Sequence, residues 1–243
     1  MGGSTASGVP EVKICGLTRV EDARLAERAG ASYVGTILVP GTPRCVSPGE
    51  AGVLARAVGI PLVAVVADLT ADAAARAADA AGARAIQLHG SESPGVVEAL
   101  RGRGGWELWK AVRVRDRNDV IRALGRYGGL VDLLLLDAWS ERALGGTGTR
   151  FPWEVWDRER AGLDDALRMG VAGGLSPDNV EEAVGRLAPD LVDVGSGVEL
   201  GPGVKDPDRI EAFIARALSG AGGAGSVSGT AAAADGSSAE SEA

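Results

Sequence analysis

Eight short apolar segments alternate with eight amphipathic stretches, and this alternation constrains the fold more than any other feature of the sequence. The segments 62–67 and 131–136 are apolar without a period of two, which is typical of parallel strands covered on both faces. Each stretch that follows has the spacing of a helix that packs one face against a sheet. The predicted strands are 12–15, 33–39, 62–67, 85–88, 108–114, 131–136, 168–172 and 191–194, and the predicted helices are 20–29, 48–58, 71–81, 94–101, 117–127, 152–160, 177–187 and 206–218.

Three of the predicted helices begin with residues that commonly cap a first turn. Thr18 lies three residues before Glu21, which predicts a capping box at the helix over 20–29. Ser47 precedes Pro48 and Ser176 precedes a second proline, so both helices are predicted to start with proline behind a capping serine.

Eight strand–helix units over residues 11–218 fit a single (β/α)8 (TIM) barrel, which we predict as the catalytic domain. An open doubly wound sheet is the alternative, but it does not require so regular a repeat, and no G-x-G-x-x-G follows the first strand. Residues 1–10 are predicted to be a flexible segment. Residues 219–243 are rich in Gly, Ala and Ser and are predicted to be a disordered tail, because they hold too little apolar surface to offset the entropy of ordering.

The charge and residue counts exclude several classes of protein. The chain of 243 residues carries 25 Lys+Arg against 33 Asp+Glu, a net charge of −8, which argues against a nucleic-acid partner. Its apolar runs are far shorter than the roughly 20 residues that span a membrane, and no secretory leader is recognisable, so we expect a cytoplasmic protein. One histidine and two cysteines make a multi-histidine metal site and a disulfide framework implausible, and we expect no metal or cofactor.

If the fold is a barrel, the active site lies where the strands end at their carboxyl side. Cys15 ends the first strand, Arg44 lies in the loop after the second, His89 ends the fourth and Asp137 ends the sixth. A thiol, a guanidinium, an imidazole and a carboxylate are therefore predicted to meet at one rim.

Each of these residues also has a purely structural interpretation. Cys15 could be a small buried apolar residue, but Lys13 shares its strand face, and a nearby cation would move the thiol towards the thiolate that a base requires. Arg44 could be solvated or could clamp a planar carboxylate. His89 could contact a ligand or make a structural hydrogen bond, and the carboxylate of Asp137 must be solvated, paired or functional.

The loops after the last two strands are rich in glycine. Gly173 and Gly174 follow the seventh strand, and Ser196 and Gly197 follow the eighth, close to Asp193. Glycine leaves backbone N–H groups open to an anion, and phosphate sites of barrels are built at this place, so a phosphate site is favoured over glycines that only make tight turns.

These residues carry a resemblance to a known family. The segment Lys13-Ile14-Cys15-Gly16-Leu17-Thr18 resembles the first-strand signature of phosphoribosylanthranilate isomerases of tryptophan synthesis, and further motifs follow in the family's order. These motifs are TPRCVS (42–47), QLHGSE (87–92), LLLDAW…GGTGTRFPW (134–153), VAGGLSPDNV (171–180) and VDVGSGVELGPGVKD (192–206).

The resemblance implies a cofactor-free Amadori rearrangement of N-(5-phosphoribosyl)anthranilate to 1-(2-carboxyphenylamino)-1-deoxyribulose 5-phosphate by a monomer or homodimer. It implies that Cys15 is the general base at the sugar C2 and Asp137 the general acid at the ring oxygen. It assigns the anthranilate carboxylate to Arg44 and places His89 and Asp193 near the sugar and ring. The phosphate is assigned to Gly173, Gly174, Ser196 and Gly197.

Four positions depart from the family pattern, one of them Pro152, since FPW (151–153) replaces the more usual F-D-W. Gly195 stands where the strand-eight motif usually has serine, Cys45 replaces a larger residue, and Trp139 follows strand six in place of a smaller polar opening. These departures leave open a relative that acts on a modified anthranilate. Two further alternatives are another phosphosugar enzyme and a phosphate-binding barrel without catalysis. The thiol on the first strand disfavours the former, and the presence of both Cys15 and Asp137 disfavours the latter.

Overall fold

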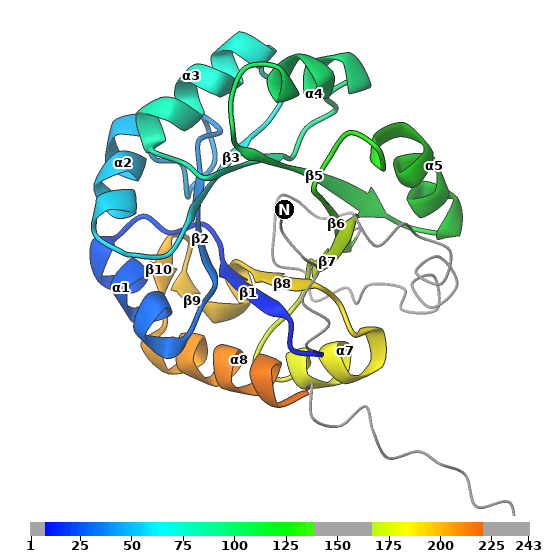
Figure 1. Cartoon of the computed structure of the whole chain (residues 1–243). Helices are drawn as coiled ribbons and strands as arrows, with labels where there is room; N and C mark the ends of the chain where they lie inside the picture. The colour runs from blue at the N-terminus through cyan, green and yellow to red at the C-terminus, as the bar shows by residue number, and fades with distance from the viewer. Residues whose placement is uncertain (1–7, 139–166, 221–243) are drawn as a thin grey trace, which may run out of the picture.

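The computed structural model describes residues 8–138 and 167–220, and in it eight parallel strands close into a barrel. Each strand pairs with the next along the chain, and the circle is completed by pairing of the first strand with the last. The barrel prediction is therefore confirmed, and the open sheet is excluded (Figure 1). The strands are β1 (Glu11–Ile14), β2 (Tyr33–Ile37), β3 (Leu62–Val66), β4 (Ala85–Leu88), β5 (Glu107–Val114), β6 (Leu133–Ala138), β7 (Arg168–Ala172) and β8 (Leu191–Val194).

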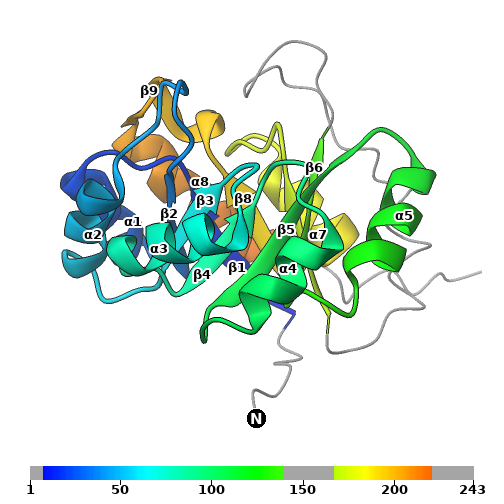
Figure 2. The same cartoon turned by 90° about the horizontal axis from the view of Figure 1, so that it is seen from above.

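Helices surround the ring of strands, as Figures 1 and 2 show from two directions. The helix predicted over 152–160 lies outside the described residues, as do 1–7 of the predicted N-terminal segment, 221–243 of the predicted tail, and Trp139. No helix in the two described ranges is long and apolar enough to cross a membrane. The helices are α1 (Val20–Ala29), α2 (Pro48–Arg56), α3 (Ala71–Ala81), α4 (Pro94–Arg101), α5 (Arg117–Tyr127), α7 (Val180–Leu187) and α8 (Pro207–Ser219).

Two of the predicted helix starts differ from the structure. The Thr18 capping box is wrong, because the Thr18 hydroxyl donates to the Gly203 carbonyl at 2.6 Å and the residue before α1 has no side-chain cap. The helix predicted from residue 177 begins only at Val180, after a turn in which the Ser176 hydroxyl accepts from the Asp178 N–H at 3.2 Å. The start of α2 is confirmed, with a complete capping box between Ser47 and Glu50.

A short hairpin after β8 was not predicted. A 3-10 turn, η2 (Ser196–Val198), leads into β9 (Glu199–Gly201), which pairs antiparallel with β10 (Val204–Lys205). Figure 2 shows β9 at one end of the barrel, outside the ring of strands. The hairpin brings Glu199 and Lys205 to the mouth of the barrel, where both take part in the site described below.

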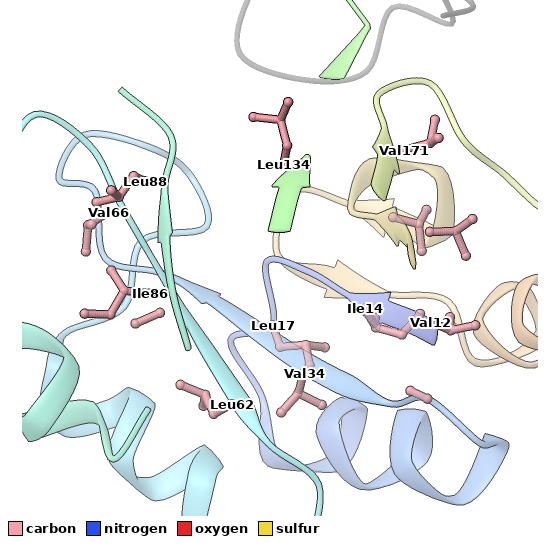
Figure 3. Packing of buried hydrophobic residues seen from close by; sticks show 14 of the residues in the cluster. Val12, Ile14, Leu17, Val34, Leu62, Val66, Ile86, Leu88, Leu134 and Val171 are labelled. Carbon is pink, nitrogen blue, oxygen red and sulfur yellow. The ribbon is translucent and has the colours of Figure 1, made fainter. Parts of the chain in front are cut away.

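The larger apolar core lies between the strands and the helices. Val12, Ile14 and Val34 face outward from β1 and β2 and are almost completely buried (Figure 3). Burial of each such side chain contributes about 1.5–3 kcal/mol of transfer free energy, which makes this layer the main source of stability.

The interior of the barrel is filled at the amino-terminal ends of the strands. Tyr33 and Trp109 pack edge to face with ring centroids 4.9 Å apart. Beside them Arg168 forms ion pairs with Glu11, at 2.6 Å, and with Glu107. Because this end is filled by side chains, space for a ligand is left at the opposite end, where the strands finish.

Candidate active site

A cavity of about 1020 Å³ opens at the carboxyl ends of the strands. Such a volume accommodates a small organic ligand. Every site residue predicted from the sequence lines this cavity, so residues from six strand ends and their loops do converge. These residues are Cys15, Arg44, His89, Asp137, Gly173, Gly174, Asp193, Ser196 and Gly197.

Lys13 and Cys15 project together into the barrel from β1, as the period of two requires. The neighbouring strand makes room for them with Gly35. A Cβ at Gly35 would lie 2.8 Å from the Lys13 Cε and 3.1 Å from the Cys15 Sγ. Any larger residue at position 35 would therefore push the ammonium and the thiol out of their positions.

Burial and charge act in opposite directions on the Cys15 thiol. Burial raises the pKa of Cys15, and the nearby carboxylate of Asp193 raises it too. The ammonium groups of Lys13 and Lys205 lower the pKa, but the balance is a raised value. The cation foreseen in the sequence is thus present, yet it does not by itself make the thiol acidic.

A chain of polar contacts crosses the interior from β8 to β6. The ammonium of Lys13 donates to Asp193 Oδ2 at 2.9 Å and to Gln87 Oε1 at 3.0 Å. Gln87 Nε2 lies 3.0 Å from His89 Nδ1, and His89 Nε2 lies 3.4 Å from Asp137 Oδ2. The buried pair with Asp193, together with Cys15, raises the pKa of Lys13 although burial lowers it.

Asp193 has one carboxylate oxygen left over. Its Oδ2 accepts from Lys13, whereas its Oδ1 is buried with no hydrogen-bond partner among the described residues. An unpaired buried oxygen is costly, and this one belongs to a residue on the cavity wall. A ligand that donates a hydrogen bond there would remove the cost.

Arg44 is held by a carboxylate from the hairpin. Its Nε and Nη2 donate to the two oxygens of Glu199 at 2.8 and 2.6 Å. Lys205 donates to the same carboxylate at 3.0 Å and to the Gly195 carbonyl at 2.8 Å. Burial raises the pKa of Glu199, but Arg44 and Lys205 lower it by more. Two cations thus share one carboxylate, which leaves excess positive charge at this side of the mouth.

The two glycine-rich loops touch each other. Gly173 and Gly174 both adopt left-handed backbone conformations, with φ of 81° and 66°. In the loop after β8, a Cβ on Gly197 would lie 1.9 Å from the Leu175 carbonyl oxygen, which no side chain could tolerate. At Gly195 a Cβ would meet only the Cys15 carbonyl oxygen at 3.8 Å, an ordinary contact.

The sequence prediction missed several residues that line the cavity or lie next to it, and four of them contact or pair with the residues described above. Gln87 lies two residues before His89 on the same strand face, so the argument used for Lys13 and Cys15 would have found it. Arg113 lines the cavity, and it is the residue of β5 that pairs with Asp137 of β6. The other two, Glu199 and Lys205, lie in the unpredicted hairpin.

Comparison with known proteins identifies relatives along almost the entire described chain. Residues 12–216 match the family model described as N-(5'phosphoribosyl)anthranilate (PRA) isomerase. N-(5'-phosphoribosyl)anthranilate isomerase of Paracoccus denitrificans is 44% identical over 211 residues, which cover 85% of this chain and 96% of the relative. Phosphoribosyl anthranilate isomerase of Thermotoga maritima is similar in structure, with a TM-score of 0.79 and 33% identity over 86% of this chain and 98% of that one.

A second solved structure is informative because of its ligand. It is a phosphoribosyl anthranilate isomerase in complex with reduced 1-(o-carboxyphenylamino)-1-deoxyribulose 5-phosphate. It superimposes with a TM-score of 0.75 at 32% identity and covers 86% of this chain and 98% of its own.

Proposed function

This chain belongs to the N-(5'-phosphoribosyl)anthranilate isomerase family, and on that premise we propose how its residues carry out the family's reaction. The substrate is N-(5-phosphoribosyl)anthranilate, and the product of the Amadori rearrangement is 1-(2-carboxyphenylamino)-1-deoxyribulose 5-phosphate, an intermediate of tryptophan biosynthesis. The observation that carries the proposal is one cavity lined by a thiol, a carboxylic acid, an arginine and two glycine-rich loops.

The reaction begins with opening of the sugar ring. Asp137 gives a proton to the ring oxygen while the bond between that oxygen and C1 breaks, and the nitrogen lone pair forms a C1=N bond. Asp137 becomes a carboxylate, and the positive charge moves to the iminium. The partly buried position of Asp137 supports this role, because its side chain is 23% exposed and lines the cavity.

Cys15 then removes the proton from C2 as a thiolate. The electrons of the C–H bond form a C1=C2 enolamine and neutralise the iminium. The Cys15 thiol then returns a proton to C1 while the C2 hydroxyl gives its proton to the Asp137 carboxylate and C2=O forms, which completes the keto product and restores both groups. Because burial raises the pKa of Cys15, the thiol needs more positive charge nearby than Lys13 and Lys205 supply. The iminium formed in the first step provides that charge.

The rest of the cavity binds and orients the substrate. Arg44 pairs with the anthranilate carboxylate, since only its Nε and Nη2 donate to Glu199 and its Nη1 does not. Asp193 Oδ1 accepts from the amine or a sugar hydroxyl. The phosphate is bound by the backbone of the two glycine-rich loops: Gly173, Gly174, Ser196 and Gly197.

The activity itself is tested by following the fluorescence of phosphoribosylanthranilate that is generated in situ. The full-length chain is expected to accelerate the loss of this fluorescence and to yield the keto product. No acceleration over the spontaneous decay would refute the proposed reaction. We also propose a cytoplasmic location and either a monomer or a homodimer, since one chain supplies all the groups named here.

Arg44→Ala is expected to reduce kcat/KM about 10- to 100-fold, because a charge-assisted hydrogen bond contributes about 1.5–3 kcal/mol. Glu199 keeps Lys205 as its partner, so the hairpin should stay in place. The control is a substrate analogue with aniline in place of anthranilate, which has no carboxylate to lose. An equal loss of activity on both substrates would show that Arg44 does not bind the carboxylate.

Gly197→Ala is expected to raise KM more than about tenfold, because its methyl group must separate the two loops that bind the phosphate. Gly195→Ala is the matched control, two residues away, with room for a methyl group. Its KM should stay within about twofold of the parent value. If Gly197→Ala binds substrate normally, the phosphate does not lie between these loops.

A further inference from the structure

The polar chain inside the barrel connects a lysine to the single histidine of the sequence through its single glutamine. Lys13 and Gln87 are almost completely buried, and His89 stands between Gln87 and the proposed acid, Asp137. The mechanism above uses Asp137 but gives Gln87 and His89 no task. The direction of the hydrogen bonds along this chain indicates one.

The first link has only one possible direction. An ammonium group donates hydrogen bonds and cannot accept them. The Lys13 ammonium is paired with Asp193 at 2.9 Å, and this pairing raises the pKa of Lys13 despite burial. The Gln87 atom that faces Lys13 at 3.0 Å must therefore be the carbonyl oxygen, Oε1.

The second link follows from the first. With Oε1 turned to Lys13, the NH2 group of Gln87 faces His89 Nδ1 at 3.0 Å. An NH2 group donates, so Nδ1 has to accept and cannot carry a proton. In the neutral ring the proton then sits on Nε2, which is the nitrogen 3.4 Å from Asp137 Oδ2.

We propose that Lys13, acting through Gln87, fixes the tautomer of His89 so that its Nε2–H points at Asp137. Gln87 is then a positioning residue of the active site. Its carbonyl oxygen accepts from Lys13, so its NH2 group donates to His89 Nδ1, and the ring proton is left on Nε2, which faces Asp137.

This arrangement would assist the ring-opening step, and to that extent it rests on the proposed function. The Nε2–H approaches one oxygen of Asp137, Oδ2, and leaves the other oxygen, Oδ1, to carry the proton to the sugar. When that proton leaves, the same Nε2–H stabilises the new carboxylate. The distance of 3.4 Å is long for such a bond, but catalytic hydrogen bonds commonly shorten when the substrate is bound.

The sequence makes the tautomer directly measurable. Full-length chain without a histidine tag, labelled with 15N in histidine, gives ring signals from one residue only. A long-range 1H–15N correlation spectrum at neutral pH is expected to show an unprotonated-type Nδ1 and a protonated-type Nε2. The opposite pattern, or two averaged nitrogens, would overturn the proposal.

Two substitutions change the donor at position 87. In Gln87→Glu the carboxylate accepts from Lys13 and also from the imidazole, so the proton is expected to move to Nδ1. In Gln87→Met no donor faces Nδ1, and a mixture of tautomers is expected. If either variant keeps the parent spectrum, Gln87 only fills space. The parent spectrum remains decisive if a variant does not fold.

Thr36→Val is the matched control for removing a polar group from the barrel wall. Thr36 is completely buried on the outward, helix-facing side of β2, like Val34, and its hydroxyl has no partner among the described residues. This variant keeps the side-chain shape and is expected to leave both the tautomer and the kinetics unchanged.

The kinetic readout separates positioning from a general structural effect. Gln87→Met is expected to lower kcat about 10- to 100-fold with little change in KM, because the substrate contacts are intact. A rise in KM with unchanged kcat would overturn the role in the proton step. The tautomer is read without substrate, so it stays testable even if the chain fails to isomerise phosphoribosylanthranilate.

Discussion

Cys15→Ala is expected to lower kcat about 10²- to 10⁴-fold, because the variant has no base at the sugar C2. The alanine fits the space of the thiol, so the protein should remain folded and bind substrate with a similar KM. Steady-state kinetics with the fluorescence assay measure both constants. The chain offers a matched control in Cys45→Ala, since Cys45 is its other cysteine and is exposed. Near-parental kcat in Cys15→Ala would remove the thiol from the mechanism.

The pH dependence gives a second check on the same residue. Burial raises the pKa of Cys15. The pH profile of kcat/KM should therefore rise with pH, and the apparent pKa of this rising limb should lie above the ordinary thiol value of about 8.5. In the pH profile of kcat, the apparent pKa of the rising limb should be lower, because the iminium in the enzyme–substrate complex favours the thiolate. Cys15→Ala should lose both limbs in its residual activity, whereas Cys45→Ala should keep them.

Asp137→Asn is expected to cause a loss of similar size, about 10²- to 10⁴-fold in kcat, because an amide cannot supply the proton that opens the ring. Asparagine keeps the shape of the side chain, so substrate binding should change little. Asp79→Asn, on the exposed face of α3, is the control for loss of one negative charge.

An isotope experiment separates the acid from the base. Substrate with deuterium at C2 should react more slowly in any enzyme in which removal of this proton limits the rate. In Asp137→Asn ring opening becomes limiting, so the isotope effect on kcat is expected to vanish. A variant that retains turnover, or one that is slow but keeps a full isotope effect, would contradict the assignment of Asp137 to ring opening.

The elements of the barrel were predictable because their signals are local. Apolar runs and helical spacing recur within each unit, and the capping box of Ser47 and Glu50 lies within four residues. The period of two also placed Lys13 and Cys15 on one face. Thr18 failed as a cap for a tertiary reason, because its hydroxyl bonds to a carbonyl 185 residues away.

The contacts that tune the site were not predictable from spacing alone. The pair of Arg44 with Glu199 joins residues 155 apart, and that of Lys13 with Asp193 joins residues 180 apart. Barrel closure brings β1 beside β8, and the hairpin after β8 supplies the carboxylate for Arg44. Neither contact leaves a mark in the local sequence.

The central claim is that the thiol of Cys15 and the carboxyl group of Asp137 act on one bound sugar phosphate. A crystal structure of this chain with the reduced product analogue tests it most directly. We predict Cys15 Sγ against C2, Asp137 against the hydroxyl on C4 that derives from the ring oxygen, and the phosphate between the loops of Gly173 and Gly197. A ligand bound with C2 turned away from the thiol, or with Asp137 out of contact with the sugar, would contradict the account.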